Sequence, residues 1–545
     1  MNCSCIPQSQ APKATALYRD YVYDSDHLSR FYQRSPFDPA SFHATAEMIR
    51  DFHQNRRQLA AILARQNRAL GCADETLANI ERLAEPGTFA VVTGQQVGLL
   101  SGPVFTFYKA LTAVRLARTL SDSGLPTVPV FWLATEDHDL EEVAQAQVLN
   151  EEYETVSLRD EGVRPAVRSS VGYVKLSEGI TPTLNEAEKC LPPGEARDHV
   201  MEILRDAYRP GVTWGAAFGR LMARLFSAWG VVLLDPLDEA IHHLAAPVYE
   251  RAILQARQVR NLLQERGATL VASGYHAQVH VGEDSTLVFA THQGSRAAIH
   301  QRGDDYEVEG SGRISRADLK HWVEQRPIDF SPSALLRPLV QDFLLPTVSY
   351  VAGPAELAYL AQSQVVYEEF GRPLPVIFPR ASFTLVDHRT QRLLEKYRLE
   401  VPDMWQGEEH LQRKIAAAGF GEGGAEGWSE RMEQSEKEIE QSLNCLRSDI
   451  ERIDPTLLDL LKHTEEKMKY QIERLRGKLS RAAFDRSSVL KRHEQELLGF
   501  LMPSHHLQER VVSGVYFLGR AGTGLLDRLL EQIQTRSSNH QILGF

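Results

Sequence analysis

The chain contains little cysteine, and its cysteines do not form the patterns that build disulfides or metal sites. Five cysteines occur among 545 residues, with no Cys-x-x-Cys pair. No close pair of histidines has a cysteine beside it, so we expect neither a disulfide framework nor zinc. A reducing cytoplasm is the expected compartment. Cys3-Ser-Cys5 could form a metal or redox site, but its position near the end of the sequence favours a frayed terminus. The cysteines are Cys3, Cys5, Cys72, Cys190 and Cys445.

Long apolar runs and an excess of positive charge are also missing. No run approaches the roughly 20 apolar residues that cross a membrane, and the first residues lack the apolar core of a secretory signal. The net charge of −12 argues against extensive contact with nucleic acid, although it leaves room for a local basic pocket. With 43% hydrophobic and 24% charged residues the composition is that of a globular protein. A chain of this length predicts two or three domains.

The common nucleotide-binding and nucleophile motifs are absent as well. There is no G-x-x-x-x-G-K-[ST] and no G-x-S-x-G. The Gly-rich loop at residues 93–103 places its glycines at four-residue steps, not in the G-x-G-x-x-G spacing. The sequence therefore does not predict a P-loop, a standard dinucleotide fingerprint or a serine-hydrolase elbow.

What is present is a strand–loop–helix–strand pattern over residues 89–142. Two apolar runs, 89–93 and 127–134, predict buried parallel strands, and Pro103 suits the first turn of the helix between them. Further strand-like runs lie at 230–236, 345–351 and 375–379. We therefore predict a Rossmann-like, doubly wound parallel sheet. The loop after the first strand and the acidic cluster after the second should share the carboxyl edge of the sheet, where such sheets bind ligands.

The Gly-rich loop is the first candidate ligand site. A helix N-terminus at Pro103 could hold a phosphate or carboxylate, and buried amides such as Gln95 and Gln96 need partners. A tight structural turn is an equally good explanation, and Lys109 could reach a phosphate or lie on the surface. The candidate binding residues here are Thr93, Gly94, Gln95, Gln96, Gly98, Gly102, Pro103 and Lys109.

The acidic cluster Glu136-Asp137-His138-Asp139 is the strongest chemical signal. Three adjacent carboxylates repel one another unless a cation or hydrogen bonds offset the repulsion. They could hold Mg²⁺ or a substrate amine, and His138 is the expected general base. Asp139 could instead cap the next helix, whose first turn would then contain two glutamates.

A second strand–Gly-Pro–helix pattern begins at Tyr350 and supplies further candidates. Glu356 could hold an ammonium group, or it could simply follow the preference for acids in a first helical turn. Tyr359 and Gln362 continue the same helical face. The candidate binding residues are Tyr350, Gly353, Glu356, Tyr359 and Gln362.

The remaining chain predicts a modular architecture. Residues 1–85 are expected to be helical, and the core spans 1–395 with inserts at about 150–210 and 270–330, the second rich in strands. A Gly-rich break near 419–427 ends a flexible linker, 396–428. Heptads over 429–502 predict a coiled coil whose second helix spans about 456–500. The tail, 503–545, is expected to return to the core.

Several segments together resemble one family. TGQQVGLLSGPVFTFYKA (93–110) and PVFWLATEDHD (129–139) are followed by RPLVQD (337–342), LPTVSYVAGPAELAY (345–359), FPRASFT (378–384), Pro503 and LQER (507–510). In this order they resemble the cysteine ligase family of bacillithiol biosynthesis, over nearly the whole chain. The resemblance implies amide formation between cysteine and the amine of glucosaminyl malate, a core like that of class I aminoacyl-tRNA synthetases, and a coiled coil that forms homodimers.

This resemblance adds two candidates and leaves three residues without a role. Arg380 and Ser382 occupy the place of a late phosphate-binding loop in class I synthetase-like folds, but the lysine-rich signature of that loop is missing. Arg337, Gln341 and Asp342 match the family, and the sequence suggests no function for them.

The resulting hypothesis is a cytoplasmic ligase that uses ATP or ADP, with Mg²⁺ at Glu136, Asp137 and Asp139 as an option. Its partners would be cysteine and glucosaminyl malate, without nucleic acid or membrane. The alternative is a non-catalytic protein that binds a nucleotide or amino sugar and recruits a partner through the coiled coil, and a related ligase could use another amine. The sequence leaves open whether ATP becomes ADP or AMP, which pocket binds nucleotide, and whether the coiled coil pairs within or between chains.

Overall fold

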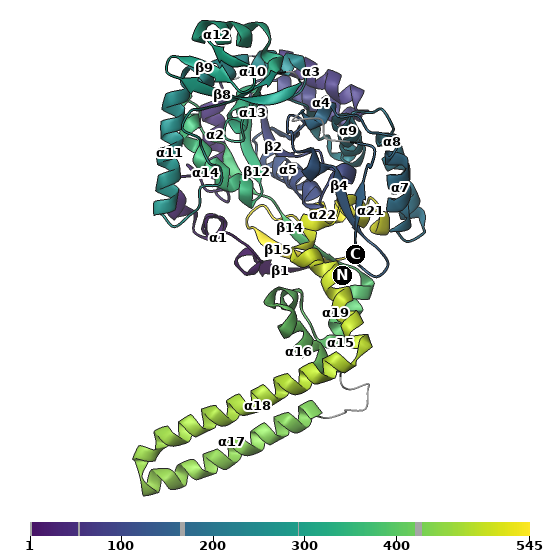
Figure 1. The fold of residues 1–545 in the computed structure, drawn as a ribbon, viewed down its shortest axis with the longest axis vertical. Helices are drawn as coiled ribbons and strands as arrows, with labels where there is room; N and C mark the ends of the chain where they lie inside the picture. The colour runs from purple at the N-terminus through teal and green to yellow at the C-terminus, as the bar shows by residue number, and fades with distance from the viewer. Residues whose placement is uncertain (1–2, 53–54, 164–168, 293, 420–427) are drawn as a thin grey trace.

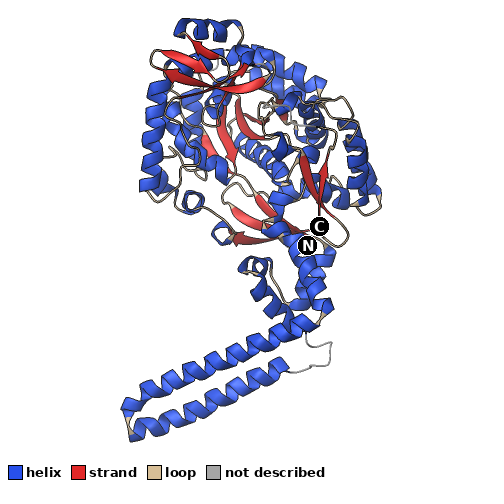
Figure 2. Ribbon diagram, in the orientation of Figure 1, coloured by secondary structure: helices blue, strands red, loops and turns tan. Residues whose placement is uncertain are grey.

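The computed structural model describes residues 3–52, 55–163, 169–292, 294–419 and 428–545. A large α/β head is joined through a short helical neck to a long two-helix arm (Figure 1). Strands lie in the head and next to the neck, while the arm is entirely helical (Figure 2). Within the described residues, no helix is both long enough and apolar enough to cross a membrane.

A five-stranded parallel sheet forms the centre of the head. Its order is β13-β12-β2-β3-β6, so the chain starts in the middle, moves to one side and then returns to build the other. This reversal places a topological switch point between β2 and β12. The predicted Rossmann-like fold is confirmed. The strands are β2 Phe89–Gln95, β3 Thr127–Leu133, β6 Val232–Leu234, β12 Thr347–Ala352 and β13 Val376–Pro379.

Helices cover both faces of this sheet because successive strand residues point to opposite sides. Val91 and Val351 pack toward α2 (Pro39–Ile49) and α5 (Phe105–Asp122), in a cluster with apolar residues of both helices. Val92 belongs to the cluster on the other face. That cluster contains residues of α3 (Arg56–Ala69), α4 (Asp74–Ala84), α10 (Glu239–Leu254), α11 (Ala256–Ala272), α13 (Arg337–Leu344) and α14 (Pro354–Glu369).

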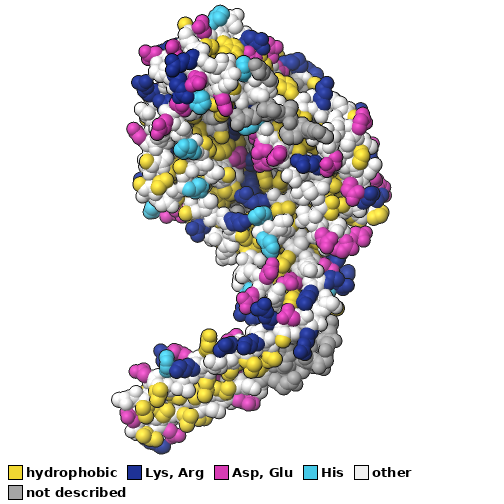
Figure 3. All heavy atoms as spheres, in the orientation of Figure 1, with side chains coloured by type: hydrophobic (Ala, Val, Ile, Leu, Met, Phe, Trp, Pro, Cys, Tyr) yellow, Lys and Arg dark blue, Asp and Glu magenta, His cyan; other side chains and the backbone are white. Residues whose placement is uncertain are grey.

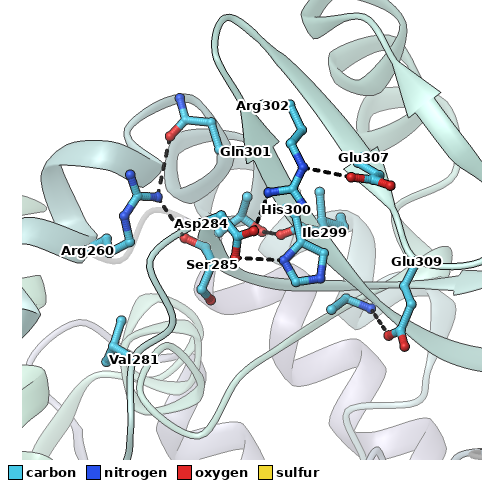
Figure 4. Close-up of polar contacts among 12 residues, drawn as sticks. Arg260, Val281, Asp284, Ser285, Ile299, His300, Gln301, Arg302, Glu307 and Glu309 are labelled. Carbon is cyan, nitrogen blue, oxygen red and sulfur yellow. Dashed lines mark hydrogen bonds and ion pairs between the residues drawn. The ribbon is translucent and has the colours of Figure 1, made fainter.

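A second sheet, entirely antiparallel, occupies the segment expected to be a strand-rich insert. Its order is β10-β9-β8-β7-β11, and α12 (Arg316–Gln325) follows β10. Just before β7, Asp284 accepts a hydrogen bond from His300 and pairs with Arg302, both near the end of β8, and Arg302 in turn pairs with Glu307 (Figure 4). The strands are β7 Ser285–His292, β8 Ser295–Arg302, β9 Asp305–Val308, β10 Gly312–Ile314 and β11 Phe330–Pro332.

A third sheet joins both ends of the chain next to the neck. Its strands are β1 Cys3–Pro7, β15 Asn539–Gly544 and β14 Ser382–Val386, with β15 in the middle. The expectation of a frayed end at Cys3-Ser-Cys5 is therefore wrong, because the edge of β15 supplies backbone hydrogen-bond partners that a sequence pattern does not reveal. The tail also contributes α20 Gln508–Val511, α21 Gly514–Ala521 and α22 Leu525–Gln532.

The first insert and its surroundings are mostly helical. A hairpin of β4 (Gln145–Leu149) and β5 (Thr155–Arg159) spans the start of this insert. The remaining head helices are α1 Ala16–Tyr23, α6 Leu140–Val143, α7 Ile180–Lys189, α8 Glu195–Ala207 and α9 Trp214–Leu225.

The neck and arm differ in two ways from the expected linker and coiled coil. Part of the proposed linker forms α16 (Glu408–Gly419), whose Leu411 and Ile415 are fully buried at helical spacing. The Gly-rich stretch 420–427 lies outside the described residues. The second long helix is interrupted at Ser487, which caps the next helix. The other helices here are α15 His388–Tyr397, α17 Trp428–Ile453, α18 Leu458–Arg486 and α19 Ser488–Leu501.

Candidate functional site

A cavity of about 400 Å³ opens at the carboxyl edge of the central sheet. Figure 3 shows the head hollowed in this region, with basic and acidic side chains inside the hollow. Its size falls within the range of small-molecule sites. The polar lining residues are Gln95, Gln96, Lys109, Glu136, Asp137, Arg296, Ser333, Arg337, Tyr350, Glu356, Tyr359, Arg380 and Arg510.

The order of the strands determines the order in which the polar side chains lie along this edge. Arg380 follows β13, Glu356 follows β12, Gln95 ends β2 and Glu136 follows β3. The two switch-point strands thus place Glu356 and Gln95 in the middle of the row. Arg380 and Glu136 lie toward its opposite sides. The sequence prediction that the loops after the first two strands meet at one edge is correct.

Lys109 is buried rather than on the surface. Its Nζ donates to Gly94 O at 2.7 Å and to Gln95 Oε1 at 2.9 Å, and it pairs with Glu356 Oε2 at 2.5 Å. These contacts use all three of its N–H donors. Glu356 also accepts hydrogen bonds from Tyr350 Oη and Gly353 N. Burial alone would raise the pKa of Glu356, but Lys109 and these donors hold it below its ordinary value.

The Gly-rich loop divides into a half that lines the cavity and a structural half. Gly94, Gln95 and Gln96 line the cavity. Gly98 and Gly102 pack against each other so closely that a Cβ on Gly98 would lie 2.8 Å from Gly102 Cα. Pro103 pairs with Ser513 in an isolated bridge.

The expected anion seat at the start of the following helix is covered. The helix α5 begins two residues after Pro103, and Val104 N donates to Val512 O in the tail. Thr93 is a buried strand residue whose hydroxyl donates to Val351 O. The helix start that does reach the cavity is that of α14, where Gly353, Pro354 and Ala355 line the wall. Its first N–H groups have no acceptor within the helix.

Two members of the acidic cluster are already satisfied by the protein. Asp137 accepts hydrogen bonds from Gln96 Nε2 at 2.7 Å and from two backbone N–H groups. Asp139 caps α6 by accepting from Glu142 N at 3.0 Å. His138 is exposed and its Nδ1 lies 3.3 Å from Arg296 Nη1. Neither Asp139 nor His138 is among the residues lining the cavity.

Glu136 is the carboxylate with unused capacity. It is 8% exposed, and its Oε1 has no hydrogen-bond partner within the described part of the chain. His242 Nε2 lies 3.6 Å from Oε1, and His242 is not among the residues that line the cavity. Burial raises the pKa of Glu136 to about 7, against the opposing charges of Arg296 and Arg337.

Three arginines add positive charge to the cavity without direct carboxylate partners. Arg296 comes from β8, lies over the ring of Phe289 and donates to Ser331 Oγ and Pro332 O. Arg337 comes from α13, and Arg510 from α20. Among the described residues, no Asp or Glu oxygen lies within 4.0 Å of a nitrogen of any of these guanidinium groups.

Comparisons with known proteins match the same two-part architecture. Residues 1–381 match the family model described as "Bacillithiol biosynthesis BshC, N-terminal Rossmann-like domain", and residues 383–545 match the corresponding "C-terminal coiled-coil domain". The chain belongs to the BshC family of bacillithiol biosynthesis.

BshC relatives match over nearly their whole length. Proteins described as "Putative cysteine ligase BshC" from Solibacter usitatus and Koribacter versatilis are each 37% identical to this chain, over 100% and 97% of it and 100% and 98% of the relatives. The relative from Salinibacter ruber is 36% identical over 97% of this chain and 96% of its own length.

In this BshC chain, three of the candidate binding residues lie away from the cavity or are already paired. Ser382 is in strand β14, where it bonds to Glu509 Oε2 and His540 Nδ1. It does not form a phosphate loop. Gln362 is buried and bonds to the backbone of Val279. Arg380 does line the cavity, but it is paired with Glu509 at 2.6 Å.

The sequence missed the arginines that complete this BshC site. Arg337 lay within a quoted family segment but had no assigned role, and Arg510 ends another segment. Arg296 gave no signal, because it lies on a strand of the insert whose placement over the sheet edge depends on tertiary packing.

The donor set is not that of a protein-bound metal. Within the described residues there is no group of three or more His, Cys, Asp or Glu side chains that could hold a metal ion. Asp137 and Asp139 use oxygens to accept hydrogen bonds from Gln96 and backbone N–H groups, and the possible Mg²⁺ position at this cluster stays a prediction.

Proposed function

We propose that this chain is a ligase that joins the carboxylate of cysteine to the amine of glucosaminyl malate in a nucleotide-dependent reaction. The observation that carries the proposal is Glu136, a buried carboxylate on the cavity wall whose Oε1 lacks a hydrogen-bond partner among the described residues. An amine must lose a proton when it forms an amide, and a carboxyl with a pKa of about 7 is suited to accept it.

Glu136 replaces His138 as the general base in this proposal. His138 is exposed and does not line the cavity, whereas Glu136 is nine-tenths buried and does. The carboxylates of Glu356 and Asp137 are occupied by three donors each, so neither is free to receive an ammonium group. The amine of the substrate therefore belongs beside Glu136.

The opposite side of the row of strands suits an anionic group. The start of α14, Arg380 and Arg510 lie there, and helix N-termini and arginines bind phosphates. ATP, as a co-substrate, would transfer a phosphoryl or adenylyl group to the cysteine carboxylate, and phosphate or AMP would then leave with one carboxylate oxygen when the amine attacks the acyl carbon. Any Mg²⁺ would arrive with the nucleotide. Placing this end across the cavity from Glu136 leaves the cysteine carbon between the leaving group and the amine.

The arm is proposed to pair with the arm of a second copy. Large apolar side chains are exposed along α17 and α18, including Leu446 at 50% and Leu475 at 51%. Figure 3 shows hydrophobic side chains gathered along one face of the arm. An apolar stripe of this kind in a helical hairpin is typical of a coiled-coil interface.

Mass spectrometry of the full chain incubated with glucosaminyl malate, cysteine, ATP and Mg²⁺ tests the activity. We expect a new mass equal to both substrates joined with loss of water, accompanied by ADP or AMP. Substrate binding without product or nucleotide cleavage would instead favour the non-catalytic binding protein. Replacing glucosaminyl malate with glucosamine in the same assay tests whether the amine substrate is assigned correctly.

A further inference from the structure

Within the described part of the chain, Arg337 has no counter-ion in the cavity, unlike the buried cations Lys109 and Arg380. Lys109 is paired with Glu356 at 2.5 Å, and Arg380 with Glu509 at 2.6 Å. No Asp or Glu among the described residues lies within 4.0 Å of the Arg337 guanidinium. Like Arg296 and Arg510, Arg337 therefore brings to the cavity a positive charge that no carboxylate of the described residues neutralises.

Neutral groups hold the Arg337 guanidinium. Nη1 donates to Gln341 Oε1 at 3.1 Å, and Nη2 donates to Tyr359 Oη at 3.0 Å and Tyr350 Oη at 3.3 Å. The guanidinium carbon also lies 5.9 Å from the centroid of the Trp132 ring. These three hydrogen bonds leave the Nε–H and one N–H of Nη1, of the five N–H donors of an arginine, to donate to a ligand such as a carboxylate.

The charge on Arg337 persists despite its surroundings. Burial opposes the charged form, but the tyrosines Tyr359 and Tyr350 and the nearby Glu356 raise the pKa of Arg337 above its ordinary value. A partly buried cation that keeps its charge and lacks a counter-ion carries a desolvation cost that an anionic ligand relieves.

A chain of buried hydrogen bonds fixes the neutral group that holds Arg337. Gln341 is fully buried and donates through Nε2 to Asp342 Oδ1 at 2.9 Å, which turns its Oε1 toward Arg337. Asp342 in turn accepts from the Tyr367 hydroxyl. The amide of Gln341 thus separates the acid from the arginine, so that Asp342 orients the guanidinium without neutralising it.

From this arrangement we infer that Arg337 recognises a carboxylate of the amine substrate, and that Gln341 and Asp342 are positioning residues that keep Arg337 oriented and charged. The inference rests on the proposed function, in which the amine substrate carries the two carboxylates of malate. The cysteine carboxylate does not fit this role, because its activation by ATP converts it into an uncharged acyl group. A permanent ion pair with Arg337 would oppose that step. Arg337 is therefore a specificity residue that separates glucosaminyl malate from amino sugars without an acid group.

Calorimetric titration of the full chain, without nucleotide, tests this directly. The probes are glucosaminyl malate and methyl glucosaminide, which has the amine but no carboxylate. Wild type is expected to bind glucosaminyl malate more tightly by about 10- to 100-fold, the effect of one charged hydrogen-bonded contact. Arg337→Gln should remove most of this difference while leaving methyl glucosaminide binding unchanged.

Gln341→Glu tests the positioning role without removing Arg337. It places a carboxylate beside the guanidinium, and we expect the KM for glucosaminyl malate to rise about tenfold or more while kcat at saturation changes little. Gln301→Glu is the matched control, because Gln301 Oε1 also faces an arginine, Arg260 at 3.5 Å, but lies in the insert sheet away from the cavity (Figure 4). The control should bind both probes like wild type.

The outcomes separate this inference from the proposed function. If wild type binds both probes equally, or if Arg337→Gln weakens both equally, Arg337 does not select the carboxylate, although the ligase reaction could still be correct. If wild type binds neither probe, the proposed substrate is wrong and this inference falls with it. If Arg337→Gln does not fold, Tyr359→Phe serves instead, because it removes the Tyr359 hydroxyl that accepts a hydrogen bond from Arg337 Nη2. This variant should lose a smaller part of the preference for glucosaminyl malate over methyl glucosaminide. No change in that variant's selectivity would count against the inference.

Discussion

Lys109 and Glu356 form a buried ion pair of 2.5 Å that ties α5 to the first turn of α14 across the switch point of the sheet. Burial is the main influence on Lys109 and lowers its pKa, while Glu356 acts in the opposite direction. The pair also orients Gln95 through the second bond of Lys109. It is therefore one of the contacts that join the parts of the cavity wall that follow β2 and β12.

Removing one partner of this pair should be costly. Lys109→Met leaves the Glu356 carboxylate buried without its cation, and we expect the free energy of unfolding to fall by about 3–5 kcal/mol. Urea denaturation followed by circular dichroism measures the change. The double variant Lys109→Met with Glu356→Leu should recover part of the loss, since it removes the stranded charge. Equal destabilisation by the single and double variants would show that the pair acts through packing alone.

The second prediction concerns substitution of Glu136, the proposed general base. Glu136→Gln retains size and hydrogen-bonding capacity but cannot accept a proton at neutral pH, so we expect kcat/KM for amide formation to fall by about 100-fold or more. His138→Ala, the matched change at the exposed residue of the same cluster, should alter kcat/KM by less than about threefold. Product formation measured by mass spectrometry gives both values. A large loss in His138→Ala together with an active Glu136→Gln would return the base role to His138.

The same residue predicts how stability depends on pH. The pKa of Glu136 is about 7 in the folded chain against 4.5 ordinarily. Between these two values the unfolded chain releases its proton while the folded chain keeps it, so this residue lowers stability as pH rises from 4.5 to 7. At pH 8, Glu136→Gln should therefore be more stable than wild type by up to about 3 kcal/mol.

This stability difference should shrink progressively as the pH is lowered toward 5. Urea midpoints at pH 5.5, 6.5 and 8 check the trend, with Asp139→Asn as a control that removes a nearby exposed carboxylate. A constant difference between Glu136→Gln and wild type across this range would mean that the Glu136 carboxyl is not protonated more readily in the folded chain.

The sequence predicted the elements of the core because their signals are local. Apolar runs bounded by glycine and proline located all five parallel strands, and the polar residues that follow β2, β3 and β12 were expected at one edge. What failed depends on contacts distant in the sequence. Lys109 could not be paired with Glu356 from spacing, because 247 residues separate them in the chain.

The same limit explains the errors around the Gly-rich loop and the neck. The start of α5 is covered by the tail near Val512, and the Ser382 hydroxyl is hydrogen-bonded to Glu509 and His540. Both of these predicted anion-binding positions are therefore occupied by residues more than 120 positions away in the chain. Arg296 enters the cavity from an inserted strand. Its place in the cavity depends on how the insert packs over the central sheet. The sequence around Arg296 contains no motif that predicts this packing.

The arm provides the last prediction. Leu446 on α17 and Leu475 on α18 are about half exposed, and pairing with a second copy would remove such apolar surface from water. We expect wild type to be a dimer in multi-angle light scattering at micromolar concentration, and the variant with Leu446→Glu and Leu475→Glu to be a monomer. Lys462→Glu changes charge on the same helix without altering an apolar side chain and should remain a dimer. A wild-type monomer at all concentrations, or a dimer that persists in the double variant, would show that the apolar stripe on the arm is not the interface.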